Sequence, residues 1–160
     1  MKYFAITVCS FFLSSYAYSI ELNGTWKEDV SKTIQWNSTY RNIEDGYLNK
    51  LKAVMGHLYI SYSNGEMCSY TESHVVQFKG KSSKRGALFF KSSYEVIAEN
   101  KFGFVLKSII DGQQNIDMIV FENDTSIYGL GLTTEDYGQP GFRTYFKKVS
   151  GLKEMAKCSE

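Results

Sequence analysis

The sequence predicts an all-β fold, an antiparallel up-and-down β-barrel of 8–9 strands with a helical insert after the first strand. Three observations support this prediction. Turn signals separate strand-like segments about every 11 or 12 residues in the second half of the chain, the composition includes 12 Tyr and 11 Phe, and no long helix is expected after Gly56. A flat sheet with this many strands would expose its edges, so closure into a barrel is favoured.

The first 19 residues have the features of a secretory signal peptide. Lys2 precedes an apolar run that reaches Leu13, and small residues at Ala17 and Ser19 suit cleavage. The apolar run is shorter than the roughly 20 residues that a membrane-spanning helix needs. We therefore expect a signal peptide over residues 1–19, export to the periplasm or beyond, no stable membrane anchor, and one domain over residues 20–160.

The charge balance disfavours one class of partner. The chain has 18 Lys and Arg against 17 Asp and Glu, and loss of Lys2 with the signal peptide would leave the two signs equal. Nucleic-acid binding calls for a marked basic excess, so we expect no nucleic-acid partner.

The elements before residue 57 are an opening strand and the helical insert. Residues 20–26 suit a short strand, and Asp29 suits the N-cap of a helix. Apolar residues then recur at spacings of three and four through Met55, with a break near Asp45 and Gly46, and Gly56 suits the end of the helix.

From His57 the apolar period changes to two, which is typical of strands. Asn64-Gly65 is a strong hairpin signal, and turn signals follow at 100–101, 111–112 and 123–124. Two strands near 75–78 and 87–90 are expected to flank a loop, KGKSSKR, and the last strand is expected at 142–149. Residues 152–157 suit a short helix.

The cysteines predict a disulfide rather than a metal site. Cys9 lies in the expected signal peptide, which leaves Cys68 and Cys158 as an even pair in an oxidising compartment. Neither has a second Cys or a His at metal-ligand spacing, so no metal is expected.

Two short motifs, Gly24-Thr25-Trp26 and Arg143-Thr144-Tyr145, together with the order of elements, resemble the calycin superfamily of lipocalins and fatty-acid-binding proteins. The resemblance implies that Gly24 and Trp26 belong to a structural closure of the barrel base, against a basic residue of a late strand. It also implies that Arg143 and Tyr145 bind a ligand carboxylate inside the barrel.

The residues themselves leave alternatives open. Arg143 and Tyr145 share one face of a strand, but Arg143 could instead pack over Trp26 or face solvent. The aromatic residues of the strands could line a cavity or fill a solid core. The basic residues from Lys79 to Arg85 could contact an anionic surface or simply be solvated.

No catalytic motif is present, and His57 and His74 are the only histidines. We therefore expect a non-enzyme without a cofactor that binds a small apolar or amphipathic ligand; the alternative is a periplasmic protein-binding module, such as an immunity or inhibitor protein. The Asn-x-Ser/Thr triplets at Asn23, Asn37 and Asn123 would carry glycans only in a cell that glycosylates exported proteins.

Overall fold

The computed structural model describes residues 21–41, 43–110, 112–130 and 141–150. The expected signal peptide, Cys158 and the expected C-terminal helix lie outside these residues. The described elements are two helices and ten strands: β1 Gly24–Glu28, α1 Val30–Arg41, α2 Asp45–Val54, β2 Leu58–Ser63, β3 Glu66–Thr71, β4 His74–Phe78, β5 Lys81–Arg85, β6 Leu88–Asn100, β7 Gly103–Ile110, β8 Gln113–Asn123, β9 Ser126–Leu130 and β10 Arg143–Val149.

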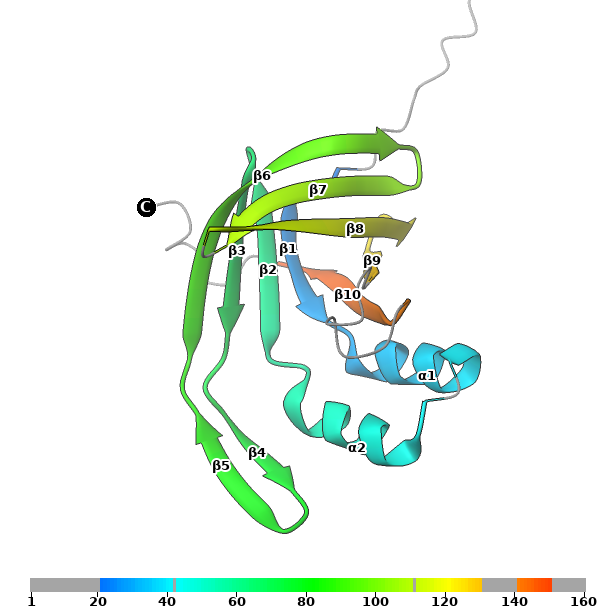
Figure 1. The fold of residues 1–160 in the computed structure, drawn as a ribbon, viewed down its shortest axis with the longest axis vertical. Helices are drawn as coiled ribbons and strands as arrows, with labels where there is room; N and C mark the ends of the chain where they lie inside the picture. Colours follow the sequence, from blue (N-terminus) through cyan, green and yellow to red (C-terminus); the bar gives the residue numbers. More distant parts are fainter. Residues whose placement is uncertain (1–20, 42, 111, 131–140, 151–160) are drawn as a thin grey trace, which may run out of the picture.

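Eight of the strands form a closed antiparallel barrel in the order β1-β10-β9-β8-β7-β6-β3-β2 (Figure 1). The last strand closes it by pairing with the first, with Trp26 opposite Lys148 and Glu28 opposite Phe146. The other neighbours follow the chain as a meander, except that the β4–β5 hairpin separates β3 from β6 in the sequence. The predicted all-β barrel with a helical insert after the first strand is therefore confirmed, and its architecture is compatible with a calycin-like fold.

Two tight turns differ in how well the sequence predicted them. Asn64 and Gly65, with φ of 50° and 78°, form the predicted turn between β2 and β3. Lys79 and Gly80 repeat this geometry, with φ of 49° and 71°, and start a second hairpin. The expected loop over 79–85 is therefore wrong, because Lys81–Arg85 pairs with β4 along its whole length. Its hydrophilic composition concealed the strand, since neither of its faces is buried.

The helical insert lies at one end of the barrel (Figure 1). Asp29 caps α1 as predicted, because its Oδ1 accepts a hydrogen bond from the Lys32 N–H at 3.1 Å. Gly56 follows α2 with φ of 96°, the left-handed conformation expected after a helix end. The two helices share a small apolar cluster with the start of β10: Ile34, Leu48, Leu51, Met55 and Phe142. No helix among the described residues is both long enough and apolar enough to cross a membrane.

The main core lies inside the barrel and defines its inner face. Its buried members are Leu22, Trp26, Tyr62, Leu106, Ile119, Phe121, Ile127 and Phe146. Because side chains alternate along a strand, these residues fix which positions point inward and which point outward.

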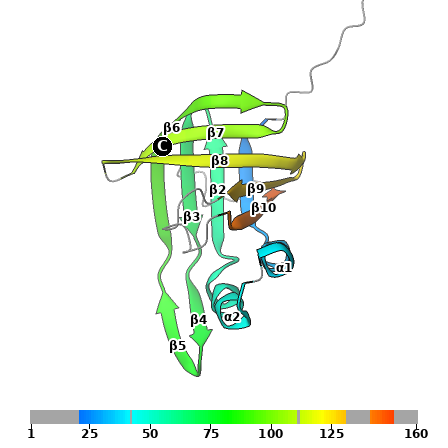
Figure 2. The same cartoon turned by 45° about the vertical axis from the view of Figure 1, so that its right-hand side comes forward.

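The β4–β5 hairpin extends beyond the barrel (Figures 1 and 2). It forms a separate two-stranded sheet, with β4 on the side of α2 and β5 on the outer side. We call residues 74–85 the arm.

Candidate functional site

Trp26 lies at the centre of the barrel closure that Gly-x-Trp predicted. Its side chain is fully buried, its Nε1–H donates to the Leu22 carbonyl at 2.9 Å, and its ring meets Phe121 edge-on at 6.4 Å. The basic residue over its ring is Lys148, with Nζ 5.3 Å from the ring centroid. The expected basic partner, Arg143, lies elsewhere, because Lys148 is the residue that pairs with Trp26 in the strand register.

Gly24 has a definite role in this closure. Its φ is 129°, and a Cβ there would lie 2.8 Å from Cε of Lys148. The absence of a side chain therefore leaves room for the Lys148 chain to cross the end of the barrel and cover Trp26.

Arg143 and Tyr145 share a face, as predicted, but that face is the outer one. Phe146 pairs with Ile127, and both belong to the barrel core. Arg143 and Tyr145 alternate with Phe146 and so point away from the barrel interior. The expectation that the pair binds a carboxylate inside the barrel is therefore wrong in its direction.

The Arg143 guanidinium is held between aromatic rings. Its Cζ lies 4.0 Å from the centroid of Trp36 and 4.2 Å from that of Tyr128, and Nη1 donates to the Tyr145 hydroxyl at 3.4 Å. Its Nε is buried, and no described residue forms a hydrogen bond with it. Stacking of this kind stabilises a cation by about 0.5 to 2 kcal/mol, so Arg143 contributes to attaching α1 to the outside of the barrel.

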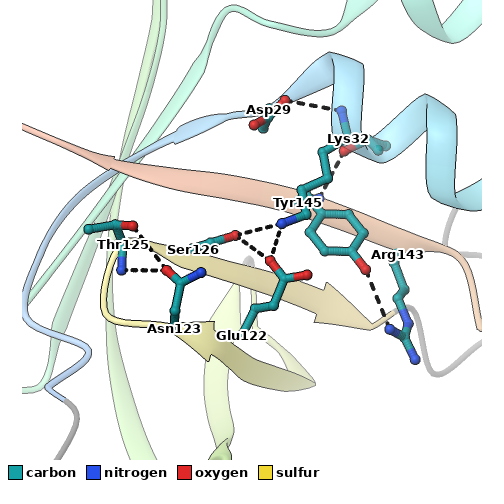
Figure 3. Close-up of polar contacts among 9 residues, drawn as sticks. Asp29, Lys32, Glu122, Asn123, Thr125, Ser126, Arg143 and Tyr145 are labelled. Carbon is teal, nitrogen blue, oxygen red and sulfur yellow. Dashed lines mark hydrogen bonds and ion pairs between the residues drawn. The ribbon is translucent and has the colours of Figure 1, made fainter.

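A polar group beside Arg143 makes the same attachment (Figure 3). The Lys32 ammonium of α1 pairs with Glu122 of β8, and Ser126 of β9 donates to the same carboxylate at 2.8 Å. Burial by itself raises the pKa of Glu122, but the hydrogen bonds from Lys32 and Ser126 outweigh it and leave the pKa below its ordinary value. Lys32 also lies 5.1 Å above the Tyr145 ring.

α1 also replaces a strand along the edge of β10, which the sequence did not reveal. β1 ends opposite Phe146, and beyond that point Thr33 Oγ1 accepts from the Tyr145 N–H at 2.9 Å. Asn37 accepts from the Arg143 N–H at 3.1 Å and donates to the Arg143 carbonyl at 2.7 Å. These buried side chains satisfy backbone groups that would otherwise lack partners. Asn37 is therefore inaccessible to a glycan in the folded protein.

The barrel interior contains a polar group among its aromatic residues, and we call it the lumen site: Tyr62, Ser92, Tyr94 and Ser108. Tyr94 packs edge-on against Tyr62 at 5.7 Å and pairs with Ser108 across β6 and β7. Ser92 shares the Tyr94 face of β6, so all four side chains point inward. The hydroxyls of Ser92 and Ser108 are buried and have no hydrogen-bond partner among the described residues.

The phenols of the lumen site remain protonated at neutral pH. Burial raises the pKa of Tyr62, and the charge of Asp117 raises it further. Burial also raises the pKa of Tyr94, which a backbone hydrogen bond from Gly65 partly offsets. The four side chains of the lumen site are therefore neutral hydrogen-bonding groups.

Glu28 is the buried carboxylate at the helical end of the barrel. It alternates with Lys27 and shares the inward face of Trp26, and its Oε2 accepts from the Gly56 N–H at 2.6 Å and the Leu58 N–H at 3.3 Å. Burial raises the pKa of Glu28, and these hydrogen bonds lower it by less. Its role is to join the end of α2 to β1.

A surface pocket of about 150 Å³ lies where β6, β7 and β8 meet. Its lining includes Phe104 and Ile119 from the inner face and Val105 and Met118 from the outer face. At this point the backbones of β7 and β8 are so close that a Cβ on Gly103 would lie 2.1 Å from the Ile119 carbonyl oxygen. Two residues of the inner face, Phe104 and Ile119, thus lie next to a surface pocket.

The two histidines stack on each other at the base of the arm. The rings of His57 and His74 lie 3.8 Å apart and nearly parallel, and His57 Nδ1 is 3.9 Å from Glu72 Oε2. Among the described residues no three His, Cys, Asp or Glu side chains are placed to hold a metal ion.

Cys68 is buried on the outer face of β3 with Tyr59, and its predicted bond to Cys158 stays a prediction.

Comparison of the chain with protein-family models, with curated proteins and with solved structures found no match.

Proposed function

We propose that this protein is an exported, non-enzymatic binding protein that holds a small amphipathic ligand inside a calycin-like barrel, with the polar group of the ligand at the lumen site. The apolar part of the ligand would contact the neighbouring interior residues Met67, Leu106 and Phe104, which pack in or against the core. Export is supported by the signal-like features of residues 1–19.

The observation that carries the proposal is the pair of unpartnered hydroxyls. Ser92 is 9% exposed and Ser108 is 3% exposed, and in the part of the chain that the structure describes neither hydroxyl has a hydrogen-bond partner. Leaving a buried polar group unsatisfied costs about 1 to 3 kcal/mol. Two such groups on the inner face of the neighbouring strands β6 and β7 are readily explained if a bound molecule completes their hydrogen bonds.

The same site argues for a neutral polar group on the ligand. Arg143, the residue expected to bind a carboxylate, faces outward, and the lumen site offers two serine hydroxyls and two protonated phenols. An alcohol, amide or carbonyl can donate to or accept from such groups without bringing an unpaired charge into the core. A fatty-acid carboxylate is therefore a poorer ligand than a neutral amphiphile.

The surface pocket where β6, β7 and β8 meet supports a route by which a ligand could enter the barrel. It is lined mainly by apolar groups and reaches Phe104 and Ile119, which contact the core cluster or belong to it. Separation of the ends of β7 and β8 at this pocket would admit a ligand without opening the helical end of the barrel.

Binding of the neutral fluorophore N-phenyl-1-naphthylamine tests the proposal. We expect saturable binding to the parent protein and binding weakened by about fivefold in the Ser92→Ala/Ser108→Ala variant, the effect of losing the one hydrogen bond of about 1 kcal/mol that the single N–H of the probe can donate. Ser93→Ala is the matched control, because Ser93 is exposed on the opposite face of the same strand. Equal affinity in all three proteins, or no saturable binding to the parent, would overturn the proposal.

The alternative expectation, a periplasmic protein-binding module, concerns a different part of the molecule. The feature that favours this alternative is the arm, which extends away from the barrel. Protein binding by the arm is compatible with a ligand inside the barrel.

A further inference from the structure

The arm has a free strand edge. β4 and β5 form their own two-stranded sheet, and within the described part of the chain β5 pairs only with β4. α2 lies beside β4, so the other edge of the arm is partly occupied (Figure 2). All five residues of β5 are exposed. A two-stranded hairpin exposed in this way is only marginally stable, and a third strand would stabilise it.

The hydrogen-bond pattern identifies which groups of β5 are available. Lys79 and Gly80 form a two-residue turn with positive φ, which makes Phe78 and Lys81 a hydrogen-bonded pair. Because bonded and non-bonded pairs alternate in an antiparallel ladder, the N–H groups of Ser82 and Lys84 point away from β4. These two donors, with the carbonyls beside them, form the free edge.

The charge of the arm indicates what kind of strand would fit that edge. Lys79, Lys81, Lys84 and Arg85 lie in the arm, and no Asp or Glu occurs between Glu72 and Glu95. Lys81 and Arg85 share one face of β5, since they are four residues apart. Lysines on an edge strand oppose pairing with another copy of the same strand, and they favour a neighbour with acidic side chains opposite them.

We propose that the arm binds an extended acidic segment of a partner protein, which adds to β5 as a third strand. The partner backbone would bond to the N–H groups of Ser82 and Lys84, and its Asp or Glu side chains would pair with Lys81 and Arg85. Main-chain hydrogen bonds give affinity in this mode of recognition, and the side chains give specificity. The proposal is independent of any ligand in the barrel.

An NMR titration of the ¹⁵N-labelled protein with a nonapeptide of alternating Glu and Thr tests this. We expect amide shifts and slowed hydrogen exchange at Ser82 and Lys84, with the barrel amides unchanged. A matched peptide of alternating Gln and Thr should bind at least about fivefold more weakly, because the cross-strand charge pairs are lost.

Two variants distinguish the contribution of the β5 backbone edge to peptide binding from that of the basic side chains. Ser82→Pro removes an outward N–H but no bond to β4, so the hairpin should persist while peptide binding is lost. Lys81→Glu/Arg85→Glu should weaken binding at least about tenfold, since attraction becomes repulsion at two positions. Lys101→Glu/Lys147→Glu makes the same charge change at exposed positions outside the arm and should leave binding unchanged.

Three results would overturn the proposal. The first is that the two charge-reversed variants weaken peptide binding equally. The second is that the Ser82→Pro variant binds the acidic peptide as tightly as the parent does. The third is that the arm binds phosphatidylglycerol vesicles but not the acidic peptide. The last result would make the arm a lipid-binding element instead.

Discussion

At the residue scale, the closure of the barrel depends on a three-part contact. Gly24 leaves space, Lys148 fills it, and the Lys148 chain covers the buried ring of Trp26. The Gly-x-Trp motif is thus explained by the conformation and small size of the glycine and by the volume of the indole, with Lys148 rather than Arg143 as the basic partner.

Replacement of Trp26 by Ala should lower the free energy of unfolding by about 3 to 5 kcal/mol, since the largest fully buried side chain is lost and the cavity cannot close. Urea denaturation followed by circular dichroism measures this. Trp36→Ala is the control, because Trp36 is only partly buried beside Arg143 and should cost less. A loss below about 1 kcal/mol for Trp26→Ala would mean that the closure is not a stabilising feature.

A pH effect is expected from His57. Burial lowers the pKa of His57 below 6.5, and the charge of His74 lowers it further, against the opposing effect of Glu72. Below about pH 6.5 the folded state therefore binds fewer protons than the unfolded state, and the stabilising contribution is lost as the pH falls from about 6.5 through the lower pKa of the folded state. The charge of Lys27 also lowers the pKa of His57 and so acts in the same direction.

Amide hydrogen exchange of the arm at pH 7.5 and pH 5.5 measures this effect. After correction for the intrinsic exchange rates, the residues of β4 should be less protected at the lower pH. His57→Phe keeps a stacking ring without the titrating group and should remove most of the difference. The same pH dependence in both proteins would show that the histidine stack does not control the base of the arm.

At the element scale, α1 acts as a substitute strand for β10. Thr33 and Asn37 are four residues apart, so they lie on one side of the helix, and they satisfy the backbone of Tyr145 and Arg143. On the outer face the helix is further held by Trp36 and Lys32. The outward Arg143 and Tyr145 are therefore part of the helix attachment.

Thr33→Val should cost about 1 to 3 kcal/mol, because the substitution keeps the shape but leaves the Tyr145 N–H without an acceptor. The measurement is again the free energy of unfolding in urea. Thr39→Val is the matched control on the same helix, where the hydroxyl is exposed and bonds only within the helix. Equal small losses in the two variants would show that the contact with β10 does not stabilise the helix.

At the scale of the whole molecule, the sequence predicted the barrel, the helical insert and most of the turns, because these depend on local period and turn residues. It did not predict which face of β10 is inside. In that strand Tyr145 and Phe146 are adjacent and both buried, Tyr145 under α1 and Phe146 in the core. The alternation of polar and apolar residues therefore does not show which face of β10 points into the barrel. It missed β5 because an exposed strand has no apolar face.

The disulfide is a prediction about the whole chain. A bond between Cys68 and Cys158 would close a loop of about 90 residues and stabilise the fold by about 4 to 5 kcal/mol on the chain-entropy model. Thiol titration of denatured, unreduced exported protein should find no reactive cysteine, and the Cys68→Ser/Cys158→Ser variant should unfold at a lower urea concentration. Two reactive thiols in the parent protein would contradict the prediction.

The central claim is that a ligand lies inside the barrel, and intermolecular nuclear Overhauser effects from bound N-phenyl-1-naphthylamine to the protein methyl groups test it most directly. The inner methyls of Met67, Leu106 and Ile119 should give contacts, and the exposed methyls of Ile109 and Val75 should give none. Contacts confined to Ile109 and Val75, with the inner methyls silent, would contradict the claim.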